Sequence, residues 1–138
     1  MIHPLVRKLQ EETFNNAPKD AIGLVIDAPL LMESGLDTLC DVIIFVDSPF
    51  EIRLKRVVEH RSWNEEQLRK RGASQIGLDT KRSSADHIII NDGDIAHIEQ
   101  QTRYSLKHTE PRKPRTPESL PFLLCVLCGL TQQSSNQE

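Results

Sequence analysis

The stretch that decides the fold runs from Leu24 to Arg56 and reads LVIDAPLLMESGLDTLCDVIIFVDSPFEIRLKR. It holds two short apolar runs, each ending in an aspartate, Asp27 or Asp47, with a proline close behind. Continuous apolar runs of this length are typical of strands buried on both faces of a parallel sheet. The carboxyl ends of such strands form the edge at which α/β folds bind ligands. We therefore expect an α/β fold with both aspartates at its ligand-binding edge.

The segments on either side continue the alternation of strands and helices, which predicts a parallel sheet. Strands are expected over residues 22–28, 42–46 and 87–90. Helices are expected over 3–16, after 48, from about 62 and over 94–106, with a short helical turn over 79–85. Ser62 followed by Glu65 matches a capping box and marks the start of the helix near Trp63.

Length and composition exclude several classes of protein. The chain has 138 residues, 38% of them apolar, and a formal net charge of -3, which gives no electrostatic case for nucleic-acid binding. Its longest apolar segment, residues 120–130, is too short to span a bilayer, and the N-terminus becomes charged too early for a secretory signal. Three cysteines without paired spacing argue against a disulfide framework and for a reducing compartment. We expect a cytoplasmic protein with no nucleic-acid or membrane partner.

Basic residues are denser in the middle of the chain than elsewhere. Arginine suits phosphate because its planar fork matches phosphate oxygens, so a basic helical hairpin beyond a sheet fits a phosphate-gripping lid. The alternative is a solvated helix face balanced by Glu59, Glu65 and Glu66. The set comprises Arg53, Lys55, Arg56, Arg61, Arg69, Lys70, Arg71, Lys81 and Arg82.

The other candidate residues also allow two interpretations. Asp27 is expected either to lie near Mg²⁺ or a substrate hydroxyl, or to be a loop aspartate that caps a turn. Asp47 is expected to cap the helix that follows it. Cys125 and Cys128 form a C-x-x-C without the second pair that a zinc site needs, which favours apolar packing. No metal site is predicted.

The segment from residue 108 to 138 differs in character from the rest. HTEPRKPRTPESLP and TQQSSNQE have the composition of disordered chain, whereas PFLLCVLCGL between them is apolar without periodicity. This apolar run either docks on the domain or belongs to an extension unrelated to the fold.

Taken in order, five motifs within residues 2 to about 100 resemble the dephospho-CoA kinase family. They are His3-Pro4-Leu5-Val6-Arg7, similar to HPL-hydrophobic-R; Asp27 to Leu36, similar to D-x-PLL-x-ESGL; Val46-Asp47 with Leu54-Lys55-Arg56; RSWNEEQLRKRGASQ over residues 61–75; and Lys81-Arg82 with Ala85-Asp86 and Ile90-Asn91.

The resemblance implies a partial P-loop NTPase-type parallel sheet over residues 1–107, with flanking helices and a helical lid at about 61–85. Residues 108–138 are expected to form a disordered or unrelated tail. It also implies transfer of the γ-phosphoryl group of ATP, with Mg²⁺, to the 3′-hydroxyl of dephospho-CoA in coenzyme A biosynthesis. The partners are then these two small molecules.

Family roles map onto individual residues of this chain. The resemblance makes Arg71 and Arg56 catalytic arginines that meet the ATP phosphates. It places Asn91, Asp92 and Gly93 near adenine. The acceptor side of the crevice is assigned to Asp27, Pro29, Leu30, Leu31 and Glu33.

One family element is missing from the 138 residues: the first strand and its G-x-x-x-x-G-K-[ST] loop, which holds the β- and γ-phosphates. Without that central strand, its neighbours are expected to have unpaired edges. We expect an upstream in-frame segment to encode the loop, and negligible turnover without it. The alternatives are a non-catalytic remnant that binds nucleotide or serves as an interaction module, and another small-molecule P-loop kinase.

Overall fold

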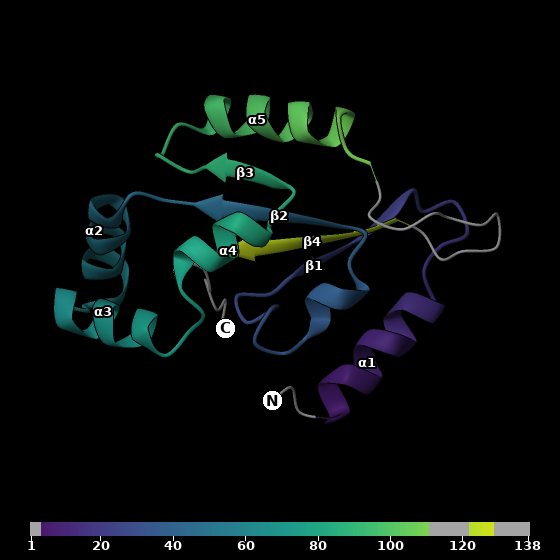
Figure 1. Ribbon diagram of the computed structural model, residues 1–138, viewed down its shortest axis with the longest axis horizontal. Helices are drawn as coiled ribbons and strands as arrows, with labels where there is room; N and C mark the ends of the chain where they lie inside the picture. The colour runs from purple at the N-terminus through teal and green to yellow at the C-terminus, as the bar shows by residue number, and fades with distance from the viewer. Residues whose placement is uncertain (1–3, 111–121, 129–138) are drawn as a thin grey trace.

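A computed structural model describes residues 4–110 and 122–128 of the chain, and it has the predicted α/β architecture. Four parallel strands form one sheet in the order β1-β4-β2-β3 (Figure 1). The strands are β1 (Gly23–Asp27), β2 (Val42–Asp47), β3 (His87–Ile90) and β4 (Phe122–Cys128). The prediction of a parallel sheet with flanking helices is confirmed.

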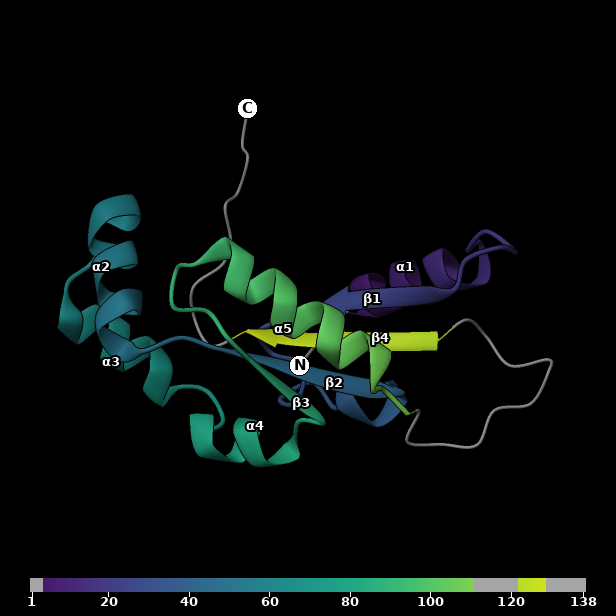
Figure 2. The same cartoon turned by 90° about the horizontal axis from the view of Figure 1, so that it is seen from above.

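The helices lie where the sequence patterns predict them, with shifts of a few residues at their ends. They are α1 (Pro4–Asn15), α2 (Phe50–Arg61), α3 (Glu65–Ala73), α4 (Leu78–Ser84) and α5 (Ile95–Lys107), with a 3-10 turn η1 (Leu36–Leu39). Helix α5 packs on β3 and α4 packs on β2. Helices α2 and α3 project beyond the carboxyl ends of the strands, as Figures 1 and 2 show. The predicted lid range, about 61–85, therefore contains α3 and α4.

Strand β4 comes from the apolar run near the C-terminus and lies inside the sheet. It pairs with β1 from Gly23↔Phe122 to Asp27↔Val126, and with β2 from Val42↔Leu124 to Val46↔Cys128. The apolar run thus takes the docking alternative. The facing edges of β1 and β2, which we expected to be unpaired, are hydrogen-bonded to β4. A strand that is buried on both faces of a sheet has apolar residues at every position, not at alternate positions. The apolar run therefore lacks the alternation that would have marked it as a strand.

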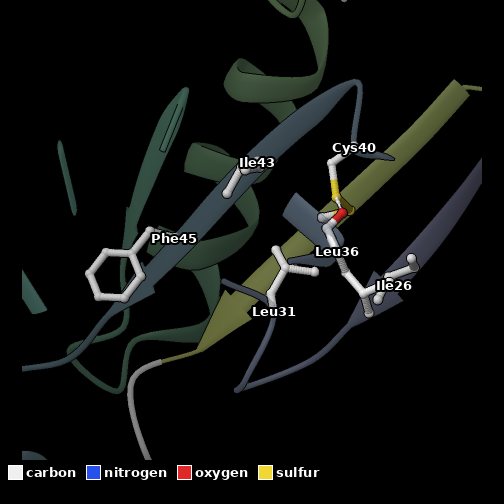
Figure 3. Packing of buried hydrophobic residues seen from close by; sticks show 7 residues of the cluster. Ile26, Leu31, Leu36, Cys40, Ile43 and Phe45 are labelled. Atoms are coloured by element: carbon white, nitrogen blue, oxygen red, sulfur yellow. Dashed lines mark hydrogen bonds between the residues drawn. A yellow bond between two sulfur atoms is a disulfide. The ribbon is translucent and has the colours of Figure 1, made fainter. Parts of the chain in front are cut away.

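The hydrophobic core lies on both faces of the sheet. On one face, the loop after β1 and η1 pack on β2 and β4 through a cluster of Ile26, Leu31, Leu36, Cys40, Ile43, Phe45 and Cys125 (Figure 3). On the other face, Val42, Ile44 and Ile89 pack against Ile98 of α5. The sheet is therefore covered on both sides, as the continuous apolar runs require.

Cys40 and Cys125 form a disulfide, so the expectation of cysteines without disulfide bonds, with Cys125 packing as an ordinary apolar residue, is wrong. Their Cα atoms are 5.9 Å apart although 85 residues separate them in sequence. Such a bond needs Cα atoms within about 7 Å, a distance that only the insertion of β4 beside β2 creates. Spacing along the chain could not reveal this pair. The disulfide ties β4 to the segment that precedes β2.

The capping box at the start of α3 is formed by residues other than those predicted. The Asn64 side chain accepts a hydrogen bond from the Gln67 N–H at 2.9 Å, and the Gln67 side chain accepts one from the Asn64 N–H at 2.9 Å. Ser62 instead ends α2 in a left-handed conformation with φ of 53°. Asparagine caps as well as serine does, so both registers were compatible with the sequence.

Candidate functional site

The carboxyl ends of the strands meet at one edge of the sheet, where Asp47 anchors the lid. Its Oδ2 accepts two hydrogen bonds from Arg82, from Nε at 3.1 Å and from Nη2 at 2.6 Å. Hydrogen bonding to Asp47 and the negative charge of Asp47 raise the pKa of Arg82. Helix α2 begins after Pro49 without any side-chain cap, so the expected capping role of Asp47 is wrong. The carboxylate binds the arginine of α4 instead and holds that helix against the sheet.

An open cavity of about 690 Å³ lies between the loop after β1 and helix α3; we call it the lid cavity. Leu30, half exposed at 49%, belongs to the loop. Lys70 and Arg71 lie in the last turn of α3. Two cations beside an aromatic ring and an apolar side chain suit a ligand with an anionic group and an apolar part. The lining residues are Leu30, Trp63, Gln67, Lys70, Arg71, Ser74 and Gln75.

Trp63 supports the predicted catalytic arginine within this cavity. The guanidinium carbon of Arg71 lies 5.3 Å from the centroid of the Trp63 ring, and that of Arg61 lies 5.4 Å from it. At such distances the ring face attracts a guanidinium group and restricts its rotation. Trp63 therefore restrains Arg71 at the cavity while its charge remains available to a ligand.

Glu33 of the predicted acceptor loop is engaged inside the protein. Its Oε1 lies 3.1 Å from Lys81 Nζ and accepts a hydrogen bond from the Ile76 N–H at 2.9 Å. Its Oε2 is buried and has no hydrogen-bond partner among the described residues. Burial alone would raise the pKa of Glu33, but hydrogen bonds from backbone N–H groups and from Lys81, with the charge of Lys81, outweigh it and lower the pKa. The carboxylate thus links the loop to the lid.

The lowered pKa of Glu33 predicts a loss of stability in acid. A carboxyl group whose pKa is lower in the folded than in the unfolded state stabilises the fold above its ordinary value of 4.5. That contribution is lost as the pH falls through the folded-state pKa. We expect the free energy of unfolding, measured with urea between about pH 6 and about pH 3, to fall less steeply in Glu33→Gln than in the unchanged chain. Equal slopes would contradict this assignment.

Arg56 and Asn91 form a second group at the edge of the sheet. Arg56 Nη2 donates a hydrogen bond to Asn91 Oδ1 at 2.9 Å, and the Asn91 N–H donates to the Asp47 backbone oxygen at 2.7 Å. Gly93 has a positive φ of 105°, and a Cβ there would lie 3.9 Å from Arg56 Nη2. The backbone N–H of Asp94 and the nearby His97 lower the pKa of Asp92. Two of the three residues predicted to lie near adenine, Asn91 and Gly93, thus lie beside Arg56.

The predicted site residues therefore fall into two groups rather than one. Arg71 and Leu30 line the lid cavity, whereas Arg56 lies with Asn91 and Gly93. Leu31 is 0% exposed and supports the loop from the core. Asp27 ends β1 at the level of Val126 in β4 and is exposed. Their roles in binding remain predictions.

The sequence predicted the lid segment, residues 61–75, but not which of its residues line the lid cavity. Lys70 is predicted as part of the basic set of a phosphate-gripping lid, and Trp63 only as a neighbour of a helix start. The other missed residues, Gln67, Ser74 and Gln75, are common polar residues of a helix and its end, which carry no signal by type. The (i, i+4) spacing of Gln67 and Arg71, and of Lys70 and Ser74, places each pair on one helix face and was the one pattern available.

Residues 4–110 and 122–128 contain neither a metal-binding cluster of side chains nor a membrane-spanning helix. No three histidine, cysteine, aspartate or glutamate side chains among them lie close enough together to hold a metal ion. We therefore assign no ligands for Mg²⁺. None of the helices described is both long enough and apolar enough to cross a membrane.

Comparison with known proteins identifies the family. A sequence model of the family described as dephospho-CoA kinase matches residues 1–97. Relatives named dephospho-CoA kinase include one from Corynebacterium jeikeium (strain K411), 37% identical over 100 residues, which are 72% of this chain and 52% of the relative. Another, from Staphylococcus epidermidis, is 32% identical over 107 residues, which are 78% of this chain and 53% of the relative.

The match to these proteins covers only part of their length. A third relative of the same name, from Corynebacterium glutamicum, is 34% identical over 97 residues, which are 70% of this chain and 48% of the relative. The chain thus spans about half the length of the curated relatives it matches. Within that span the fold, the order of the motifs and the family match agree: the chain belongs to the dephospho-CoA kinase family.

Proposed function

We propose that this chain forms the acceptor wall and the lid of a dephospho-CoA kinase, which transfers the γ-phosphoryl group of ATP to the 3′-hydroxyl of dephospho-CoA. The observation that carries the proposal is the lid cavity, which is lined by Leu30 of the predicted acceptor loop and by Lys70 and Arg71 of the predicted lid. Membership of the family favours dephospho-CoA over the acceptors of other P-loop kinases.

The chain's own residues supply orientation and positive charge. Phosphoryl transfer depends on positioning and on stabilising the charge of the transferred group, because the protein does little covalent chemistry. Arg71, supported by Trp63, presents a guanidinium group toward phosphate oxygens. Arg56 holds the turn at Asn91 through a hydrogen bond of 2.9 Å and orders the predicted adenine side. ATP and Mg²⁺ follow from the family, and the glycine-rich lysine loop that would hold the β- and γ-phosphates does not occur in the 138 residues.

Replacement of Arg71 tests the binding role of the lid. We expect Arg71→Ala to weaken binding of dephospho-CoA by about ten- to a hundredfold, because a hydrogen bond to a charged group contributes about 1.5–3 kcal/mol. Isothermal titration calorimetry measures the change. Arg103→Ala is the matched control, since Arg103 is an exposed arginine on α5 that pairs with Glu99. Equal affinities of the two variants would refute the role of Arg71.

A turnover assay tests the reaction itself. We expect the 138-residue chain to convert ATP and dephospho-CoA at a negligible rate, because the loop that positions the phosphates contributes most of the catalysis. A longer chain, in which a strand and a glycine-rich lysine loop precede residue 1, is expected to be active. Turnover by the 138-residue chain comparable to that of an intact kinase would contradict this expectation.

A non-catalytic module that binds nucleotide is the second candidate function. It is favoured by β4, which fills the position between β1 and β2 and is followed by residues 129–138, a stretch without lysine. On this alternative the longer chain binds dephospho-CoA without turning it over. The same calorimetry and turnover assays distinguish the two functions.

A further inference from the structure

Lys81 lies inside the protein, although lysine is mostly a surface residue. Its side chain is 0% exposed. Its Nζ lies 3.1 Å from each of three oxygens: Oε1 of Glu33, the backbone oxygen of Pro29 and Oε1 of Gln75. An ammonium group has three hydrogen-bond donors. Burial of the group is tolerated only when all three donors have acceptors. The full set of partners indicates a specific role for this buried charge.

The three acceptors come from the two walls of the lid cavity. Pro29 and Glu33 belong to the loop after β1, and Gln75 belongs to the connection between α3 and α4. Leu30, the neighbour of Pro29, and Gln75 itself both line the cavity. Glu33 also accepts the hydrogen bond from the Ile76 N–H at 2.9 Å, which ties the same two segments a second time. This cluster therefore ties the two walls to each other.

We infer that Lys81 is a positioning residue that holds the acceptor loop against the lid, so that one ligand contacts both walls at once. This inference rests on the proposed function. The ligand class is a diphosphate ester that carries an apolar arm, as dephospho-CoA does: the diphosphate meets Lys70 and Arg71, and the apolar part meets Leu30. A bare diphosphate meets only the two cations. Loss of Lys81 lets the walls separate, and a displacement of about 1 Å is enough to weaken binding of a ligand that bridges them.

The test compares two ligands on the full 138-residue chain. Trp63 is the single tryptophan of the sequence and lines the cavity, so its fluorescence reports binding. We expect Lys81→Met to weaken dephospho-CoA binding by about tenfold or more and to leave binding of inorganic pyrophosphate within about twofold of the unchanged chain. Lys8→Met is the matched control, because Lys8 is 73% exposed on α1, pairs with Glu12 and is expected to change neither affinity.

The outcomes separate this inference from the proposed function. A folded Lys81→Met chain that binds both ligands as the unchanged chain does overturns the inference, and so does one that loses both affinities equally. If the unchanged chain binds neither ligand, the proposed function fails, and the positioning role is then decided by hydrogen exchange. In that experiment Lys81→Met is expected to speed amide exchange in both 28–36 and 74–78. Unchanged exchange in either segment overturns the inference.

A second variant covers the case in which Lys81→Met does not fold. Lys81→Met combined with Glu33→Gln removes both charges, and replacing both members of a buried ion pair is tolerated far better than removing one. The amide of the new glutamine keeps an acceptor for the Ile76 N–H. This double variant is expected to fold and to show the same split between the two ligands. Unchanged affinity for dephospho-CoA in the double variant would likewise overturn the positioning role.

Discussion

Deletion of residues 111–138 is expected to leave a chain that no longer unfolds cooperatively. Those residues include β4, which is hydrogen-bonded to β1 on one side and to β2 on the other. Without it, β1 loses its connection to the sheet and the Cys40–Cys125 disulfide is lost as well. Loss of a native disulfide alone typically costs about 2–5 kcal/mol. Domains of this size are stable by about 5–15 kcal/mol, so the combined loss is expected to exceed the total.

Circular dichroism during thermal unfolding measures this effect, and two variants serve as controls. Deletion of 129–138 removes none of the described residues and is expected to keep a cooperative transition. Cys125→Ala removes the disulfide and keeps the strand, so it is expected to unfold cooperatively at a lower temperature. A sharp transition in the chain without 111–138 would show that β4 is dispensable for folding.

Lys81→Met is expected to destabilise the protein by about 3 kcal/mol, because it leaves the carboxylate of Glu33, which is only 21% exposed, without its cation. The backbone oxygen of Pro29 and the amide oxygen of Gln75 lose a donor in the same step. Urea denaturation at neutral pH measures the free energy of unfolding. In acid, protonation of Glu33 removes the unpaired charge, so the difference from the unchanged chain is expected to shrink.

The control for this prediction is a lysine at the surface. Lys55 is 74% exposed and pairs with Glu59 at 4.0 Å, so Lys55→Met is expected to change the free energy of unfolding by about 1 kcal/mol or less. Adding Glu33→Gln to Lys81→Met removes the unpaired negative charge. This double variant is expected to recover part of the free energy of unfolding that Lys81→Met loses. Equal destabilisation by Lys55→Met and Lys81→Met would mean that the buried pair contributes nothing specific.

Local sequence predicted the elements that depend on local physics. The runs at 22–28, 42–46 and 87–90 are strands because their apolar residues are continuous and have breakers on both sides. Helix α5 begins after Asp94, whose side chain accepts hydrogen bonds from the N–H groups of Ala96 and His97. Each of these elements depends on interactions between residues within about four positions of one another. Periodicity and capping rules describe interactions over that range.

Most features of the candidate site depended on distant partners. Asp47 was expected to cap a helix, but Arg82 competes for its carboxylate from 35 residues away. The acceptor role of Glu33 stays a prediction, and its carboxylate meets Lys81 and the N–H of Ile76, partners that the sequence did not indicate. Two charge-assisted hydrogen bonds to one carboxylate oxygen, or an ion pair shielded from solvent, are stronger than a solvated local cap, so the tertiary partner wins. Residue type could identify these carboxylates as important but could not choose their partners.

The sequence by itself determined the α/β class, the parallel sheet and, through the order of its motifs, the family. These follow from apolar periodicity and from residue types at fixed spacing, which need no knowledge of contacts. Only the tertiary structure decided that the apolar run at 122–128 is an inner strand of the sheet, that Cys40 bonds to Cys125, and that Lys81 joins the loop to the lid. The physical reason is that each of these is a contact between segments far apart in the chain. Its free energy arises from burial and pairing that exist only once those segments have met.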